Sequence, residues 1–168
     1  MPTILCFDLG VTIGFAAGAL DGYPTAHAVV LAGTDPGWRF GQAANTVRDL
    51  IVRFRPDSVW KEAPVVTTHG TTAHVLKLHY GLHAVCEEVS WRHGVPCTEV
   101  DADDVRQALI GRTRLRKVER ERKVTMKHLV AEGLVACGYD QLVRNHNTAD
   151  AVALWLFVRN DGKIRRPR

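Results

Sequence analysis

The sequence has no closely spaced pair of cysteines of the kind that binds zinc or forms a redox centre. Its four cysteines stand far apart among mostly apolar neighbours, which predicts reduced, mostly buried thiols at Cys6, Cys86, Cys97 and Cys137. No apolar run approaches the roughly 18 residues of a membrane span, and no charged leader precedes an apolar stretch at the start. We therefore expect no membrane partner and a cytoplasmic location. At 168 residues the chain is also too short for a second catalytic domain.

The positive charge of the sequence is concentrated in two segments. The whole chain has a formal net charge of +4, yet Arg106 to Lys127 alone contains nine basic and two acidic residues. Arg159 to Arg168 adds five basic residues and one acidic residue, so the remainder of the chain is acidic. This distribution favours a phosphate-backbone partner over a small neutral substrate. We expect residues 1–161 to form one domain and residues 162–168 to form a basic tail.

The spacing of apolar residues alternates between the periods of strands and helices. Strands are expected at Thr3 to Asp8, Ile13 to Leu20, Ala26 to Ala32, Asp57 to Glu62 and Val95 to Val100. Helices are expected at Trp38 to Phe54, Val75 to Val89, Val105 to Ile110, Lys117 to Leu134 and from Asn147 onward. This order predicts an α/β fold with a five-stranded mixed sheet, a leading antiparallel meander and helices on both faces.

Three carboxylates fall where this order of elements can bring them together. Asp8 ends the first strand, Glu62 ends the fourth, and Asp150 lies in the first turn of the last helix. Acids at the ends of neighbouring strands, with one from a helix packed over them, can surround a hard cation such as Mg²⁺. Two such ions would activate water and stabilise the departing oxygen of a phosphodiester. Taken singly, the acids have structural alternatives: a turn residue, an exposed strand end and a helix-capping acid, respectively.

The stretches that contain these acids are FDLGVTIGF, VWKEAPV and HNTADAVALW, and in this order they resemble the RuvC-type Holliday junction resolvases, especially the small phage-type members. The resemblance covers nearly the whole chain and implies a ribonuclease H-like fold, with residues 1–161 as the nuclease domain. It implies a crossover junction endodeoxyribonuclease that uses two Mg²⁺ ions, for which Mn²⁺ would substitute. The implied substrate is four-way branched DNA, cut by paired symmetrical nicks, and the implied active form is a homodimer.

The stretch VRQALIGRTRLRKVERERKVTMKHLV resembles the basic segment of this family, in which a lysine on a helix reaches the scissile region. Lys117 and Lys123 compete for that role. Lys123 is assigned, because apolar residues follow it three, six and seven positions later, and this implies a short charged insertion before it. The resemblance also implies phosphate contacts from Arg106, Arg112, Arg114, Arg116 and Lys117. The alternative is a solvated helix, which the i, i+4 pair of Glu119 and Lys123 would support.

A fourth metal ligand is expected just before Asp150. Many members of the family have an Asp or His three residues before the final acid, but this chain has Asn147 there and His146 one residue earlier. If Asn147 caps the last helix, its side-chain oxygen is committed to a backbone N–H, which leaves His146 as a ligand or proton carrier. We therefore assign the metal site to Asp8, Glu62, His146 and Asp150, with a plain surface histidine as the alternative for His146.

Two histidines and a cysteine offer a rival metal site. His79, His83 and Cys86 recur at a spacing that lets them face one way on one helix, as zinc ligands would, although no fourth ligand is evident nearby. The tryptophans are expected to pack in the core: Trp38, Trp60, Trp91 and Trp155.

Rival functions differ in what they would require of the sequence. The motif around Asp8 also resembles the phosphate loop of actin-like ATPases and sugar kinases, but those proteins need a duplicated domain. A DnaQ-type exonuclease would have an acid where Gly10 stands. Three alternatives stay open: a broader flap-cutting or fork-cutting nuclease, an RNA-processing nuclease of the same fold, and a branched-DNA-binding protein without catalysis.

Overall fold

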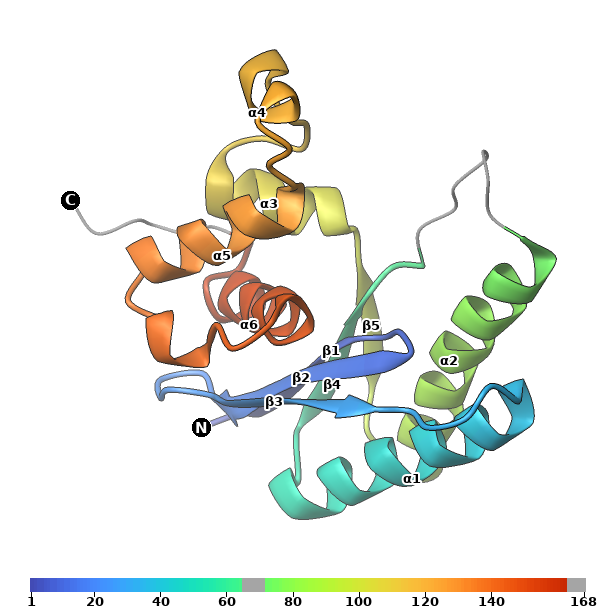
Figure 1. The fold of residues 1–168 in the computed structure, drawn as a ribbon. Helices are drawn as coiled ribbons and strands as arrows, with labels where there is room; N and C mark the ends of the chain where they lie inside the picture. Colours follow the sequence, from blue (N-terminus) through green and yellow to red (C-terminus); the bar gives the residue numbers. More distant parts are fainter. Residues whose placement is uncertain (65–71, 163–168) are drawn as a thin grey trace.

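The computed structural model describes residues 1–64 and 72–162, which contain one five-stranded sheet in the order β3-β2-β1-β4-β5 (Figure 1). The strands are β1 (Thr3–Asp8), β2 (Thr12–Ala19), β3 (Thr25–Val30), β4 (Ser58–Glu62) and β5 (Cys97–Val100). The first three form an antiparallel meander, whereas β4 runs parallel to its neighbours β1 and β5. The predicted mixed sheet is confirmed.

Helices cover both faces of this sheet, as predicted. They are α1 (Pro36–Phe54), α2 (Ala73–Arg92), α3 (Ala102–Ile110), α4 (Lys117–Glu121), α5 (Met126–Ala136) and α6 (His146–Arg159), with a 3-10 helix at Asp140–Leu142. α1 and α2 lie together on one face, while α6 packs on the other with α5 and α3 outside it (Figure 1). None of the described helices is long and apolar enough to cross a membrane.

Strand alternation divides the apolar residues into two cores. In β1, Leu5 and Phe7 belong to the core under α1 and α2, while Ile4 and Cys6 belong to the core under α6. The next residue in this alternation, Asp8, therefore faces α6. Because α6 lies between the sheet and the outer helices, its central residues are buried all round. The core on this face thus packs α6 directly against the central strands.

The long basic helix predicted from Lys117 to Leu134 is wrong. The chain leaves helical geometry after Glu121, and Lys123 adopts a left-handed conformation with φ of 57°. A new helix, α5, then begins after its N-cap residue Thr125, whose hydroxyl accepts a hydrogen bond from the backbone N–H of His128 at 3.3 Å. Two short helices separated by a turn replace one continuous helix, which changes the direction of every side chain after the turn.

Other expectations have mixed outcomes. Asp101 caps α3 and Gly111 ends it with φ of 75°, as predicted. The prediction that all four tryptophans pack in the core is wrong for two of them, since Trp38 and Trp91 are 64% and 79% exposed. The predicted basic tail beyond Gly162 and most of the polar loop before α2 lie outside the described residues.

Candidate active site

The ends of two neighbouring parallel strands bring Asp8 and Glu62 together. β1 and β4 pair with Phe7 opposite Lys61, so the next residue of each strand, Asp8 and Glu62, lies at the same edge of the sheet. Asp150 approaches them from α6, which covers that face. The three carboxylates line one cavity of about 190 Å³. The structure therefore unites the three acids that the sequence predicted as metal ligands.

The position of Asp150 depends on a close approach between α6 and β2. Gly14, in β2, lies against the backbone of Asn147, and a Cβ at this glycine would fall 2.0 Å from the Asn147 carbonyl oxygen. Glycine is needed here because any side chain would push away the first turn of α6. The helix is capped by Asn145, whose side-chain oxygen accepts from the backbone N–H of Thr148 at 2.9 Å. The close contact at Gly14 and the Asn145 cap together hold Asp150 over the strand ends.

The three carboxylates lie in a desolvated site and repel one another. Burial, followed by the charge of Asp150, raises the pKa of Asp8 to about 7. Burial, followed by the charges of Asp8 and Asp150, raises the pKa of Glu62 to about 8. Burial also raises the pKa of Asp150, against the lowering effect of Lys127. Acids clustered in this way hold protons near neutral pH until a cation neutralises them.

Two basic side chains reach the same cavity from α3 and α5. The Lys127 ammonium lies 3.1 Å from Oδ2 of Asp150, and Arg106 also lines the cavity. Although burial lowers the pKa of Lys127, the charges of Asp150 and Asp8 raise it above its ordinary value. The lysine is therefore charged, and one of the three acids, Asp150, is already paired with a positive group.

The donor set fits a hard divalent cation. Carboxylate oxygens are the ligands that Mg²⁺ prefers, and among the described residues the ion pair of Lys127 with Asp150 leaves Asp8 and Glu62 without a salt bridge. In residues 1–64 and 72–162, no three His, Cys, Asp or Glu side chains are already gathered around one point as metal ligands. Asp150 is engaged with Lys127, so ligation by all three acids would exchange this ion pair for the metal. Asp8, Glu62 and Asp150 are the residues that would hold it.

Lys127, rather than Lys123, is the lysine at the acids, which corrects the prediction. Lys123 is exposed in the turn between α4 and α5 and does not line the cavity. Its assignment rested on one continuous helix, and because α5 begins only at Met126, Lys127 is the lysine that this helix carries toward Asp150. The overlooked signal was Thr125, a good helix cap that stands two residues before the lysine.

Asn145, not Asn147, caps α6, so the argument that placed His146 ahead of the helix is wrong. His146 is the first helical residue and precedes Asp150 by about one turn. Its ring packs edge-on against that of His128, with 5.2 Å between centroids. Its charge lowers the pKa of Asp150, which places it near the acids, although it does not line the described cavity. Ligation by His146 stays a prediction.

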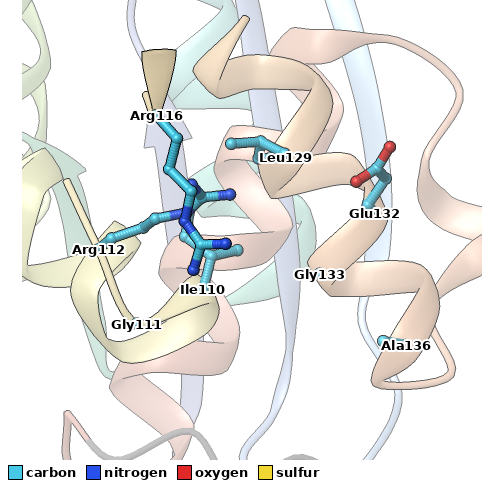
Figure 2. A pocket seen from close by; sticks show the side chains of 8 residues that line it. All are labelled: Ile110, Gly111, Arg112, Arg116, Leu129, Glu132, Gly133 and Ala136. Carbon is cyan, nitrogen blue, oxygen red and sulfur yellow. The ribbon is translucent and has the colours of Figure 1, made fainter. Parts of the chain in front are cut away.

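The predicted phosphate contacts lie in more than one place. Arg106 lines the acid cavity, whereas Arg112 and Arg116 line a second cavity of about 310 Å³ between the end of α3 and α5 (Figure 2). Arg112 is already engaged, since its guanidinium donates to both carboxylate oxygens of Glu119 at 2.7 and 2.5 Å. The other members of the predicted set are exposed: Arg114 and Lys117.

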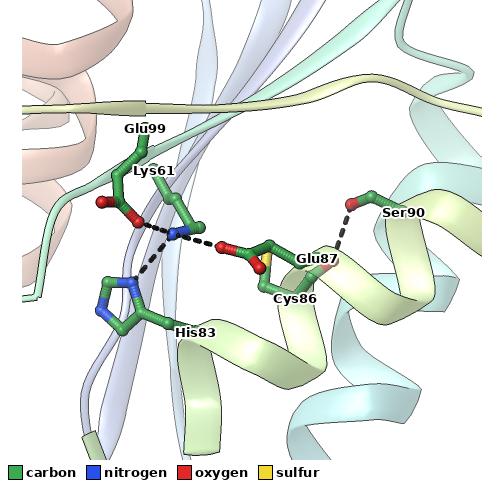
Figure 3. Close-up of polar contacts among 6 residues, drawn as sticks. All are labelled: Lys61, His83, Cys86, Glu87, Ser90 and Glu99. Carbon is green, nitrogen blue, oxygen red and sulfur yellow. Dashed lines mark hydrogen bonds and ion pairs between the residues drawn. The ribbon is translucent and has the colours of Figure 1, made fainter. Parts of the chain in front are cut away.

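The rival zinc site on α2 is not formed by the described residues. His83 accepts a hydrogen bond from Lys61 at 3.2 Å (Figure 3). The buried Cys86 thiol hydrogen-bonds with that of Cys97. None of the four cysteines forms a disulfide, and only Cys6 and Cys86 are fully buried. His79 and His83 line the acid cavity instead, which the sequence analysis did not anticipate.

Comparison with known proteins gives matches to solved structures. No protein-family model and no curated protein sequence matches the chain. RuvC of Thermus thermophilus matches with 21% identity and a TM-score of 0.69, over 95% of this chain and 97% of that protein. The same protein in complex with a Holliday junction substrate matches with 19% identity and a TM-score of 0.70, over 96% and 98%.

A third solved structure is more distant. The yeast mitochondrial Holliday junction resolvase Ydc2 matches with 12% identity and a TM-score of 0.54, over 90% of this chain and 75% of that one. The sheet order agrees with the fold that the sequence motifs implied. The two RuvC structures match it over nearly the whole of both chains. The chain has the ribonuclease H-like fold of RuvC.

Proposed function

We propose that this protein is a metal-dependent endonuclease that resolves four-way DNA junctions. The observation that carries the proposal is the convergence of Asp8, Glu62 and Asp150 in one desolvated cavity that Lys127 and Arg106 also line. A site that cleaves phosphodiesters needs acidic side chains that bind cations and, beside them, basic side chains that bind phosphate. The shared fold supports the same substrate class, since RuvC has been solved with a Holliday junction substrate.

The acids form the proposed metal site, with His146 as a further proposed ligand. A pair of Mg²⁺ ions, or Mn²⁺ in their place, would activate water and offset the charge that develops on the phosphate. The protein's own contribution is to hold the ligands at the strand ends and to release their protons as the cation binds. If Asp150 held the cation, Lys127 would lose its ion-pair partner, and its ammonium would be able to bind a phosphate oxygen. Arg106 provides a second phosphate contact on the same wall.

The DNA backbone would continue from this cavity over the basic segment. Arg116 lines the second cavity, while Arg114 and Lys117 are exposed beside it. Each phosphate that such a side chain neutralises releases counterions, so junction affinity should fall steeply with salt concentration. Removing Arg114 or Lys117 should reduce the log-log salt slope by about one unit each. Removing Arg112 should instead loosen α4, because this arginine holds Glu119.

A homodimer is part of the proposal, because paired cuts in a four-way junction require two active sites and one domain of this kind has one. Tyr80 and Trp91 of α2 are 44% and 79% exposed and are separated by about three helical turns on the same face. Two exposed aromatic side chains on one helix face support α2 as the contact between two protomers. Sedimentation of the protein with and without DNA measures the oligomeric state, and a strict monomer in both would oppose the dimer.

The deciding experiment offers end-labelled four-way, flap, bubble and linear duplex DNA to the purified protein with Mg²⁺ or Mn²⁺. Paired symmetrical nicks near the branch of the four-way junction would support the proposal. Cleavage mainly of flaps or forks would favour the broader nuclease, and binding of junctions without any cleavage would favour a binding protein. Asp150→Asn serves as the matched control, because it keeps the side-chain shape while it removes the charge that a cation requires.

A further inference from the structure

Two histidines of α2 line the acid cavity on the wall opposite Lys127, and the proposed chemistry so far makes no use of them. His79 is partly buried, and His83 is only 5% exposed. A buried polar ring at the border of a nuclease site must have its hydrogen-bonding groups accounted for, because an unpaired buried nitrogen is costly. The partners of His83 determine what it can offer to a substrate.

Lys61 fixes one nitrogen of His83. This lysine precedes Glu62 in β4 but points to the opposite face of the sheet, and its side chain is 1% exposed. Its ammonium has three N–H groups and three partners: Glu99, Glu87 with Oε1 at 3.0 Å, and Nδ1 of His83 at 3.2 Å (Figure 3). Because this ammonium is paired with two carboxylates, the lysine is held in its charged form.

This contact determines the tautomer of His83. A charged lysine can only donate, so Nδ1 must accept and the proton of the neutral ring must be on Nε2. Burial, followed by the charge of Lys61, lowers the pKa of His83 to about 4, which keeps the ring neutral. The second nitrogen faces away from Lys61 (Figure 3), toward neither glutamate that pairs with this lysine. With Nδ1 occupied and Nε2 protonated, His83 can act neither as a general base nor as a metal ligand.

His79 holds this ring in place relative to the acids. The two imidazoles are 4.9 Å apart between centroids, and His79 hydrogen-bonds with the backbone of Leu9, the residue after Asp8. α2 is thereby tied to the turn that follows β1, at the edge of the metal site. The N–H of His83 is thus presented from a fixed wall of the cavity.

We propose that Nε2–H of His83 donates a hydrogen bond to a phosphate oxygen of the DNA strand bound across the acids, and that Lys61 is the positioning residue that fixes this donor. The inference rests on the proposed nuclease function and adds a third phosphate contact, on the wall opposite Lys127 and Arg106. A neutral donor suits this place, since it binds a phosphate oxygen without repelling cations held by Asp8 and Glu62. The substrate strand is then held from both sides of the cavity.

The first measurement needs neither a variant nor catalysis. A two-bond ¹H–¹⁵N spectrum of the wild-type protein at pH 7 should show His83 as the neutral Nε2–H tautomer. In Lys61→Met, which leaves the histidine in place without its fixed donor, the spectrum should show a mixture of tautomers. A wild-type ring protonated on Nδ1, or on both nitrogens, would overturn the inference.

The second measurement identifies the contact on the DNA. His83→Leu keeps most of the side-chain volume and should slow single-turnover cleavage of a four-way junction at least about tenfold, and His83→Gln, which retains an N–H donor, should recover part of the rate. His93→Gln, at the far end of α2, is the matched control and should cleave at the wild-type rate. Methylphosphonate substitution at one phosphate near the scissile bond should slow the wild type strongly and His83→Leu by less than twofold.

The outcomes separate this inference from the function on which it rests. If wild-type protein cuts no branched DNA, the nuclease proposal falls and the phosphate contact falls with it. If the wild type cuts and His83→Leu cuts equally fast, only the role of His83 is overturned. Equal slowing of both proteins by methylphosphonate at every position near the cut would overturn it as well.

Discussion

Replacing Glu62 by glutamine should abolish cleavage but stabilise the metal-free protein. The pKa of Glu62 is raised from 4.5 to about 8, first by burial and then by the charges of Asp8 and Asp150. Between these two pH values the folded protein retains a proton that the unfolded chain has released. Stability from this group is therefore fully present below about pH 4.5 and is lost as pH rises through about 8. Glutamine remains neutral at every pH and escapes that loss.

The size of the effect follows from the size of the shift. A change of one pKa unit corresponds to about 1.4 kcal/mol, so the full shift of Glu62 sets an upper limit of roughly 5 kcal/mol at pH 8.5. Water entry and side-chain relaxation weaken interactions between buried charges, so we expect about half of this value. A gain of about 2 to 3 kcal/mol would move the urea midpoint upward by about 1 M, given slopes of about 1 to 3 kcal/mol per M.

The assay is urea unfolding in EDTA at pH 5 and pH 8.5. Wild type should lose stability between the two, whereas Glu62→Gln should lose less and should exceed wild type at pH 8.5 only. Glu121→Gln, an exposed substitution in α4, is the matched control and should follow wild type. Added Mg²⁺ should restore the wild type at pH 8.5 and leave the Gln variant almost unchanged, because ligands stabilise the state that binds them. Equal stability of wild type and Glu62→Gln at pH 8.5 would refute a desolvated, mutually repelling acid cluster.

Three further predictions concern the same site. Asp8→Asn and Asp150→Asn should each reduce cleavage at least roughly a thousandfold while junction affinity in Ca²⁺, measured by gel shift, changes less than about threefold; efficient cutting by either variant would remove that acid from the metal site. Lys127→Ala should slow single-turnover cleavage at least about tenfold, whereas Lys123→Ala in the nearby turn should change it less than about twofold, and the opposite ranking would restore the sequence-based assignment. Gly14→Ala should cost about 1 to 3 kcal/mol and reduce activity together with it, because the new Cβ meets the first turn of α6; an unchanged calorimetric Tm would show that this helix shifts freely.

The arrangement of the sheet and the three acids could be predicted because each depends on short-range patterns. Strand alternation and turn residues mark where β1 and β4 end, and acids at those ends meet wherever the two strands pair in parallel. Asp150 could be placed because the apolar run after it fixes a buried helix. The prediction succeeded at the level of strands, helices and the residues that terminate them.

The assignments that failed depended on where one helix stops and another begins. Charged residues from Lys117 to Lys123 are good helix formers, so composition alone favours a continuous helix. The chain instead turns at Lys123, and Thr125 starts a new helix. A break of a few residues rotates the helix face, and the lysine at the acids becomes Lys127. A similar shift of two residues in the cap, from Asn147 to Asn145, removed the argument for His146.

The donor at His83 was beyond a sequence-based argument for a different reason. Lys61 and Glu62 are neighbours in β4, and alternation sends one toward α2 and the other toward α6, so that the acid and the lysine act on opposite faces of a single strand. A buried lysine is acceptable there only because Glu87 and Glu99 pair with it, and those partners come from α2 and β5. Tertiary packing thus decides the charge and the tautomer of the groups behind the site. Any substitution that removes a partner of Lys61 should therefore change the orientation of His83 in the acid cavity, even though neither glutamate lines this cavity.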